Sequence, residues 1–360
     1  MNKIFRKPGG ALMLVAAFSL ISCNEMDSPV DNPVNGNLTT YRIVNLSTLT
    51  ADFVAQNTDV LTGTLQANVK ITIADSATVT LDGVTIKGES NNSYDWAGLT
   101  CAGSATLILQ DGRENVVKGF RKTRPGIYVP SGSTLTIKGN GTLTASSNGL
   151  GAGIGGGDKI SCGNIIIAGG TITASGGNGS AGIGGGTGAY DSNTCGAITI
   201  SGGTVTATGG ENAPGIGGGY SSGAEAICGD ITITGGTVAA KGGKYAAGIG
   251  SGYAYGKLAS CGNILISGGT VEAEGSDCSA GIGGGAGLDT GMGYKYESQC
   301  GTITIENTVT SVKAIKGSGA TNSIGAGNYT GASSGLCICG TVTVGGVEGA
   351  VTTSPYTYQP

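Results

Sequence analysis

Between residues 162 and 285, apolar and polar side chains alternate in short runs that are separated by Gly-Gly pairs. In the first such unit, Ile165 and Ile167 share one face of a run, and Ile172 and Ala174 share one face of the next run. Alternation with a period of two, in β-branched residues bounded by glycine, predicts short β-strands. A third short run ends the unit, with an isoleucine inside the Gly-rich segment GIGGG.

The same three-strand unit recurs at a fixed period. Its copies begin 33 residues apart and are followed by two longer copies, each offset by 39: Cys162, Cys195, Cys228, Cys261, Cys300 and Cys339. A unit of this size cannot bury its own apolar face, so successive copies must stack. Glycine makes up 72 of 360 residues. Each glycine costs a helix interior roughly 1 kcal/mol relative to alanine, which excludes a helical repeat.

The repeat therefore predicts an all-β fold: a single-stranded right-handed parallel β-helix, or solenoid, with Gly-rich coils of about 33 residues. The right hand is expected because parallel crossover connections are right-handed. The GIGGG run is not read as a phosphate loop, which occurs once, after a strand and before a helix. It also lacks the aspartate of the calcium-binding nonapeptide repeat.

The residues before the repeats have a different organisation. Basic residues precede an apolar run at 11–21 that is too short to span a bilayer. The sequence LISC, which ends at Cys23, resembles a lipobox and predicts that Cys23 carries the lipid anchor. The expected division is a lipoprotein signal peptide at 1–23, a flexible tether at 24–38 and a β-helix at 39–360, itself composed of an N-terminal cap (39–70), irregular coils (71–160), regular repeats (161–345) and a C-terminal cap or tail (346–360).

Charge narrows the choice of partner. Removing residues 1–23 deletes three of 19 basic residues and no acidic one, so the net charge becomes 16 − 23 = −7. A negative chain argues against nucleic acid as the partner. The expected membrane contact is the lipid anchor alone. Glu25 and Asp27 resemble the acidic tag of Bacteroidetes-type surface lipoproteins, which implies an outer-membrane protein exposed at the cell surface.

Two insertions in the irregular coils hold candidate binding residues. One insertion contains Trp96, the only tryptophan. The other, residues 113–124, holds five of the 16 basic residues outside the signal segment, among them Arg113, Arg121, Lys122 and Arg124. Arginine forks match carboxylates, so this segment is a candidate docking site for anionic groups such as uronates. The alternative is a solvated loop on an acidic protein.

Tyrosine gathers in the variable loops between one GIGGG-type run and the next repeat cysteine. Seven of the 13 tyrosines lie there: Tyr190, Tyr220, Tyr253, Tyr255, Tyr294, Tyr296 and Tyr329. Insertions at one repeat position emerge on one side of a solenoid, which is often the binding side. Coils stack about 4.8 Å apart, so a row of aromatic rings would suit the repeating rings of a polysaccharide. Packing of these tyrosines against their own loops is the alternative.

The runs VTLDGVTI, LILQDGRENVV and GIYVPSGSTLTIKGNGTLTA, followed by GGTITA units, resemble a bacterial family of pectate-lyase-like parallel β-helix carbohydrate-binding proteins. The resemblance covers roughly residues 70–345. It implies extracellular binding of cellulose and acidic pectic sugars without catalysis. It also makes Ca²⁺ a candidate ligand, although no residue-level calcium motif is present and no cofactor is required.

Ten cysteines are present, and six of them fall in the single column that starts the repeats. Stacked coils bring their Cα atoms near 5 Å apart, within disulfide range. A column of small buried thiols is the favoured interpretation, because free cysteine buries readily. Disulfide pairing remains open, since an exported compartment permits it. Zinc is disfavoured by the lack of histidine and of CxxC spacing.

These observations favour a non-catalytic carbohydrate-binding surface lipoprotein that recognises a plant-type or acidic polysaccharide. A structural or adhesive protein with a protein partner is the main alternative. A polysaccharide lyase or hydrolase is a third hypothesis, but histidine, the commonest general base, is absent. The best local carboxylate pair for a hydrolase is Glu272 and Glu274, which share one strand face.

Overall fold

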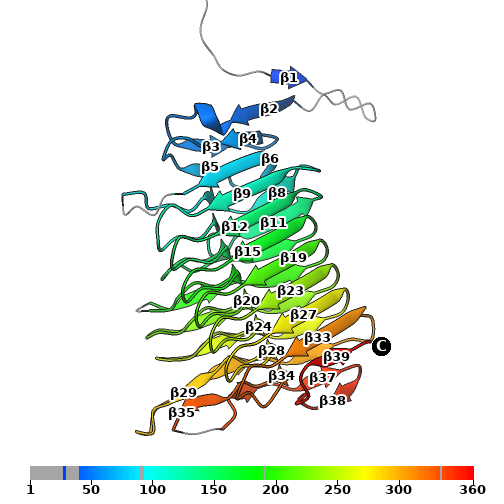
Figure 1. Ribbon diagram of the computed structural model, residues 1–360. Helices are drawn as coiled ribbons and strands as arrows, with labels where there is room; N and C mark the ends of the chain where they lie inside the picture. The colour runs from blue at the N-terminus through cyan, green and yellow to red at the C-terminus, as the bar shows by residue number, and fades with distance from the viewer. Residues whose placement is uncertain (1–26, 30–39, 89–92, 190, 333–334) are drawn as a thin grey trace, which may run out of the picture.

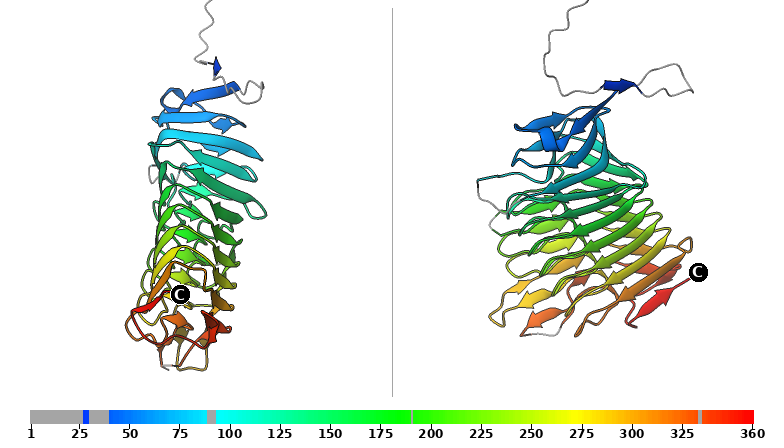
Figure 2. Two further views of the ribbon diagram at one scale, coloured as in Figure 1. Left: turned by 90° about the vertical axis from the view of Figure 1, so that its right-hand side faces the viewer. Right: turned by 45° about the horizontal axis from the view of Figure 1, so that its top comes forward.

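The computed structural model describes residues 27–29, 40–88, 93–189, 191–332 and 335–360. The expected signal peptide, the anchor at Cys23 and the candidate Tyr190 lie outside the described residues. The described chain winds into one tall stack of coils, with its N-terminal strands at one end and its C-terminal strands at the other (Figure 1, Figure 2). The coils pair with each other in parallel, and this confirms the predicted right-handed parallel β-helix.

Each coil of the regular region contributes strands to three ladders that run the length of the stack. The first ladder comprises β8 (Ala105–Leu109), β11 (Thr134–Gly139), β14 (Asn164–Ile167), β18 (Ile198–Ile200), β22 (Ile231–Ile233), β26 (Ile264–Ile266), β32 (Ile303–Ile305) and β37 (Val342–Val344). The second comprises β9 (Glu114–Lys118), β12 (Thr142–Ser146), β15 (Thr171–Ser175), β19 (Thr204–Thr208), β23 (Thr237–Lys241), β27 (Thr270–Glu274) and β33 (Ser311–Ile315). The third comprises β3 (Phe53–Ala55), β5 (Ile71–Ile73), β7 (Leu99–Cys101), β10 (Ile127–Tyr128), β13 (Ile154–Gly155), β16 (Ile183–Gly184), β20 (Ile216–Gly217), β24 (Ile249–Gly250), β28 (Ile282–Gly283) and β34 (Ile324–Gly325).

The first two ladders begin from one long strand, β6 (Ala77–Lys87), which pairs with β8 through its first half and with β9 through its end. Towards the N-terminus, β6 is preceded by β4 (Val60–Thr64) and β2 (Thr40–Asn45) in parallel pairing. A 3-10 turn at Leu46–Thr48 follows β2, and the Asn45 side chain accepts a hydrogen bond from the Ser47 amide. None of the helices in the described part of the chain is long and apolar enough to cross a bilayer.

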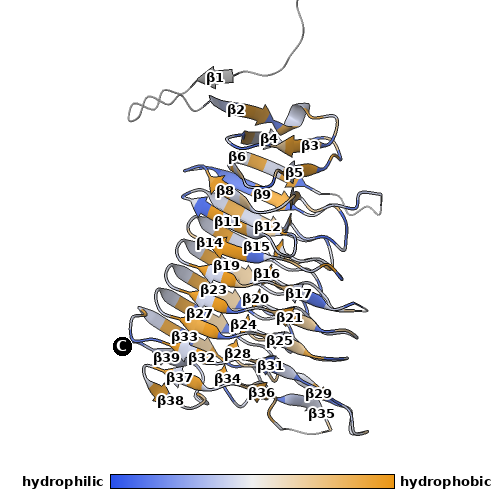
Figure 3. Ribbon diagram, turned by 180° about the vertical axis from the view of Figure 1, so that it is seen from behind, coloured by the Kyte–Doolittle hydropathy of each residue, from blue (hydrophilic) through white to orange (hydrophobic). Residues whose placement is uncertain are grey.

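Two smaller sheets lie on the loop side of the stack, at the right of Figure 3. One joins β17 (Asn193–Cys195), β21 (Ala226–Cys228), β25 (Ala259–Cys261), β31 (Ser298–Cys300) and β36 (Ile338–Cys339). The other joins β30 (Lys295–Tyr296), β29 (Gly287–Asp289) and β35 (Tyr329–Gly331).

Both ends of the stack are covered by strands that run against their neighbours. At the N-terminal end, β1 (Asp27–Pro29) pairs antiparallel with β2. At the C-terminal end, β38 (Val347–Glu348) pairs antiparallel with β37, and β39 (Tyr356–Tyr358) with β33. Reversed strands of this kind shield edges that would otherwise offer unpaired backbone groups.

The interior consists of stacked columns of like residues. Ile198, Ile231 and Ile264 are direct register partners on successive coils, and each is at most 1% exposed. Burial of one such side chain contributes about 1.5–3 kcal/mol. The alternation in the sequence is therefore the alternation between this core and the outer surface, visible as orange bands along the strands in Figure 3.

Glycine is required where the third ladder turns. Gly217 has φ +139°, and a Cβ atom built on it would lie 1.9 Å from the carbonyl oxygen of Gly250 in the next coil. Gly250 stands in the same relation to Gly283. The GIGGG run thus marks a corner where neighbouring backbones approach too closely for any side chain.

The cysteine column departs from the expected row of thiols. Cys162 and Cys195 form a disulfide with a Cα–Cα distance of 4.4 Å. The expectation of thiols alone is therefore wrong for this pair, because the coil spacing falls within the range that a disulfide needs. The remaining column members, Cys228, Cys261, Cys300 and Cys339, carry free thiols.

Candidate functional site

The variable loops emerge together and are held in register by backbone contacts. Gly188, Ser221, Ala254 and Gly287 occupy one position of successive loops, and parallel bridges join each to the next. Loop residues 33 positions apart therefore stack one above another, as the repeat predicts. This places Tyr220 and Tyr253 on neighbouring coils at equivalent positions.

A column of left-handed residues anchors these loops. It comprises Gly179, Asn212, Tyr245, Cys278 and Gly319, with φ between 59° and 74°. The carbonyl of each of the first four accepts a hydrogen bond from the loop of a following coil, for example Asn212 O from Tyr253 N at 3.0 Å and Tyr245 O from Ala286 N at 2.9 Å. The left-handed conformation thus aims the carbonyl at the loop.

Two members of this column are unusual for that conformation. Glycine and asparagine adopt positive φ readily, but a bulky side chain there is strained. Tyr245 and Cys278 occupy the position on adjacent coils with φ 61° and 59°. Strained backbone concentrates at binding and catalytic sites, where the surrounding structure holds it in place.

Tyr245 belongs to a cluster of four aromatic rings, which we call the tyrosine cluster: Tyr220, Tyr245, Tyr253 and Tyr255. The rings of Tyr220 and Tyr253 are nearly parallel, at 7°, with centroids 5.9 Å apart. The Tyr245 ring lies 4.9 Å from that of Tyr253 on its other side. Tyr255 leans against both Tyr220 and Tyr253, at 6.4 and 5.9 Å.

The four rings divide into a support and a surface. Tyr253 is 7% exposed, and its hydroxyl forms a hydrogen bond with Thr330 Oγ1 at 3.0 Å. Burial raises the pKa of Tyr253 and of Tyr220 above the ordinary phenol value. Tyr255 is 50% exposed, and Tyr220 and Tyr245 are half-buried. Tyr253 therefore holds the other three rings in place, and these three form an outward aromatic surface.

A hollow of about 660 Å³ opens beside this surface. It is lined by Tyr245, Asp277, Cys278, Ser318, Gly319, Asn328, Tyr329, Thr330, Gly331 and Ala332. Both strained residues of the left-handed column are in its wall. The hollow combines an aromatic wall with hydroxyl, amide and carboxylate groups, a composition that suits a small polar ligand with apolar faces.

Lysine ammonium groups border the same surface. Lys244 Nζ lies 4.7 Å from the centroid of the Tyr245 ring, and Lys295 Nζ lies 5.0 Å from that of Tyr329. Lys295 also approaches Asp289 Oδ2 at 3.6 Å. The cationic groups nearest the aromatic surface are therefore these two lysines.

The remaining loop tyrosines predicted from the sequence have separate environments. Tyr329 is 7% exposed and donates a hydrogen bond from its hydroxyl to Glu297 Oε1 at 3.0 Å. Burial, reinforced by that hydrogen bond, raises the pKa of Tyr329 well above the ordinary phenol value. Tyr294 is 66% exposed on the connection between β29 and β30. Tyr296 lines a second hollow of about 360 Å³ with Glu225, Lys257 and Glu297.

The basic segment does not form a single patch. Arg121 and Arg124 both bind Asp95, at 2.9 and 2.8 Å, and Arg124 is the main reason that the pKa of Asp95 falls to about 2. Arg113 binds Asp82 at 2.7 Å at the other end of β9. Five strand residues separate those ends, a distance of roughly 16 Å. Lys122 is exposed.

Trp96 also has a structural environment. Its ring packs against Phe120 at 5.8 Å and Tyr94 at 5.3 Å, and these aromatics border the core. The ring is partly buried in this cluster rather than spread on the surface. We assign Trp96 to the packing of the insertion rather than to a ligand platform.

The acidic residues offer no catalytic or metal arrangement of the expected kind. Glu272 binds Lys313 at 2.8 Å and Glu274 binds Lys241 at 2.9 Å, each across neighbouring coils of the second ladder. In the part of the chain that the structure describes, no group of three or more His, Cys, Asp or Glu side chains is placed to hold a metal ion. No step is therefore derived through calcium.

Sequence reasoning found Tyr220, Tyr253 and Tyr255 but missed Tyr245 and the wall residues Asp277 and Cys278. Those three follow the second ladder and lie outside the variable loops. A signal was present, because Tyr245 and Cys278 stand 33 residues from Asn212 and from each other. The neighbouring glycine and asparagine of that column indicate a turn position that does not suit tyrosine.

Five segments of the chain match the family model described as beta helix repeat: residues 135–158, 165–187, 198–220, 231–253 and 264–286. Each segment spans strands of all three ladders and ends in the loop that follows the third. A search among curated proteins and another among solved structures returned no match.

Proposed function

We propose that this parallel β-helix repeat protein is a non-catalytic carbohydrate-binding protein that holds a polysaccharide on its loop side. We further propose that it is a lipoprotein, anchored through Cys23 and exposed at the outer surface of the cell. The observation that carries the binding proposal is the tyrosine cluster. Three partly exposed rings are held in register on neighbouring coils and open onto a hollow with polar walls.

Sugars match this surface chemically. A pyranose ring presents a face of C–H groups and an edge of hydroxyl groups. The negative face of an aromatic ring attracts the positively polarised C–H groups. Asp277, Ser318 and Asn328 in the wall of the hollow offer donors and acceptors for the hydroxyl edge. Ring spacings near 6 Å are close to the length of one sugar unit, so consecutive sugars of a chain meet consecutive tyrosines.

Lys244 favours acidic polymers. Its ammonium group stands above the Tyr245 ring, where a uronate carboxylate could accept hydrogen bonds from it while the sugar ring packs on tyrosine. The arginines of the basic segment support this role less well, because Asp95 already occupies two of them. The preference for acidic sugars therefore rests on Lys244 and not on residues 113–124.

Retention on immobilised polygalacturonate and on a neutral plant glucan tests the proposal. The triple variant Tyr220→Ala, Tyr245→Ala and Tyr255→Ala removes the outward aromatic surface. Each ring contributes on the order of 1–2 kcal/mol, so the triple loss should weaken retention at least a hundredfold. Tyr41→Ala, on β2 at the far end of the stack, is the matched control. Analysis of the polymer for new reducing ends or unsaturated products tests the non-catalytic part.

Lys244→Gln separates acidic from neutral ligands. Its loss should weaken retention on polygalacturonate several-fold and leave the neutral glucan unchanged. Unchanged retention of the tyrosine triple variant would refute the binding site. A wild-type protein that binds no polysaccharide would refute the function and favour an adhesive role with a protein partner. Released products would show an enzyme.

A further inference from the structure

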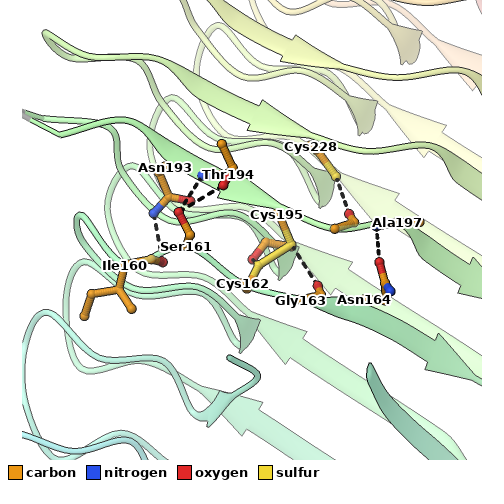
Figure 4. The surroundings of a disulfide bond; sticks show 12 residues. Ile160, Ser161, Cys162, Gly163, Asn164, Asn193, Thr194, Cys195, Ala197 and Cys228 are labelled. Atoms are coloured by element: carbon orange, nitrogen blue, oxygen red, sulfur yellow. Dashed lines mark hydrogen bonds between the residues drawn. A yellow bond between two sulfur atoms is a disulfide. The ribbon is translucent and has the colours of Figure 1, made fainter. Parts of the chain in front are cut away.

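The six repeat cysteines form one continuous column along a corner of the stack. Cys195, Cys228, Cys261, Cys300 and Cys339 are direct register partners on successive strands. Cys162 precedes them, and its amide donates to the Thr194 carbonyl at 2.8 Å, which continues the same pairing into the first coil. Every neighbouring pair in the column is therefore presented in the same backbone relation (Figure 4).

The first pair sets a phase for the rest. Cys162 and Cys195 are bonded to each other, so Cys195 is not available to Cys228. An even column of six, with its first two members paired, leaves Cys228 facing Cys261 and Cys300 facing Cys339 with none left over. Adjacent strands of a parallel sheet lie about 4.8 Å apart, within the Cα–Cα range of a disulfide.

The last pair is already in contact. The thiols of Cys300 and Cys339 share a hydrogen bond, which raises the pKa of Cys300 and lowers that of Cys339. Cys339 is also the least covered member of the column, half-buried near the C-terminal end, whereas Cys228 and Cys261 are 2% and 5% exposed. Burial raises the pKa of the Cys228 thiol to about 12.

We propose that the column is an oxidation site that closes as three disulfides, with Cys228–Cys261 and Cys300–Cys339 joining Cys162–Cys195, so that the coils are stapled in consecutive pairs. This inference is independent of the carbohydrate proposal. The co-reactant is a disulfide donor, either a small-molecule disulfide or the disulfide of an oxidase protein.

The exchange balances for each bridge. The Cys339 thiolate attacks one sulfur of the donor disulfide, forms a mixed disulfide and releases one donor thiolate, which takes up a proton. The Cys300 thiol then loses its proton and attacks the Cys339 sulfur, which releases the second donor thiol. Two protein thiols are oxidised to a disulfide, and one donor disulfide is reduced to two thiols.

Access distinguishes the two new bridges. Cys339 can meet a donor in the folded protein because its side chain is half-buried. Cys228 and Cys261 are covered by the neighbouring coils, so their bridge must close while the coils dock. A donor added after folding should therefore close the third bridge and leave the second open.

Thiol mapping of the full-length protein tests this order. Three samples are compared: folded protein, folded protein treated with oxidised glutathione, and protein refolded in a glutathione redox buffer. Each is unfolded, alkylated and digested without reduction. Among the seven free cysteines of the described chain, we expect seven, five and three alkylated positions, the last three being Cys101, Cys278 and Cys337.

Cys339→Ser should leave Cys300 alkylated under every condition and keep the peptide that links Cys228 to Cys261. Cys101→Ser, a buried cysteine outside the column, is the matched control and should change neither bridge. Linked peptides in another phase, such as Cys195 with Cys228, would overturn the proposal. Seven alkylated positions after refolding in the redox buffer would overturn it as well.

Discussion

The irregular coils of residues 71–160 and the regular repeats of residues 161–345 share the same ladders but hold their loops differently. In the irregular coils, side chains do this work: Trp96 packs on Phe120, and Asp95 binds Arg121 and Arg124. In the repeats, backbone carbonyls of the left-handed column and parallel bridges hold the loops.

The difference bears on where a ligand can bind. Where every coil repeats the same backbone contacts, loop side chains are not needed for structure, and tyrosines can stand partly exposed. Where coils differ, polar and aromatic side chains satisfy one another. A charged or aromatic residue in an irregular coil is therefore a weaker indication of binding than the same residue in a repeat loop.

The largest expected effect concerns the backbone contacts of the repeats. Gly217→Ala places a methyl group against the Gly250 carbonyl and should lower the free energy of unfolding by about 2–4 kcal/mol. Gly112→Ala, in the irregular coils, has φ +67° but no atom within 4 Å of the new carbon. It should cost only about 1 kcal/mol. Urea unfolding measures both, and equal losses would contradict the distinction.

A second pair of variants separates backbone strain from ligand contact at Tyr245. Tyr245→Asn and Tyr245→Ala both remove the ring, so both should weaken polysaccharide retention equally. Asparagine tolerates the left-handed conformation, as Asn212 does one coil earlier. The Asn variant should therefore be more stable than the Ala variant by about 0.5–1 kcal/mol. Thermal unfolding and retention, measured on the same samples, would expose any other ordering.

A third prediction concerns the ion pairs of the irregular coils. Asp95→Asn releases Arg121 and Arg124 and should raise retention on polygalacturonate about two- to threefold. Because Asp95 is 46% exposed, the loss of stability should stay below about 1 kcal/mol. Affinity electrophoresis in low salt measures the first effect. A decrease in retention would show that Asp95 positions the arginines for the ligand instead of occupying them.

The smallest effects are those of pH, and they should divide the two regions. The pKa of Asp95 is lowered to about 2 by Arg124 and Arg121. Its contribution to stability is thus present above pH 4 and is lost as the pH falls from about 4 towards 2. Tyr329 has a raised pKa, so its contribution is present below pH 10 and is lost as the pH rises further.

Two spectroscopic signals report these changes separately. Fluorescence of Trp96, the only tryptophan, follows the irregular coils in acid. Phenolate absorbance follows the tyrosines in alkali, where Tyr329→Phe should remove the last component to ionise. A Trp96 signal that changes in alkali before it changes in acid would contradict this assignment.

Much of the fold was predictable because the period of 33 residues fixes which residues stack. Ile198 over Ile231 follows from that offset alone. The contacts of Asp95 were not predictable, since its partners lie 26 and 29 positions away in coils that share no period. The disulfide was only partly predictable: the offset brings Cys162 beside Cys195, but bonding depends on side-chain torsions that a repeat pattern does not encode.

The antiparallel strands at the two ends have a consequence for assembly. In polymer terms, an open parallel coil is a growing end, because it offers the same template to another molecule that it offered to its own last coil. A reversed strand alters the hydrogen-bond pattern at that face and terminates growth. Deleting residues 346–360, which removes β38 and β39, should turn a particle of fixed length into the seed of a filament.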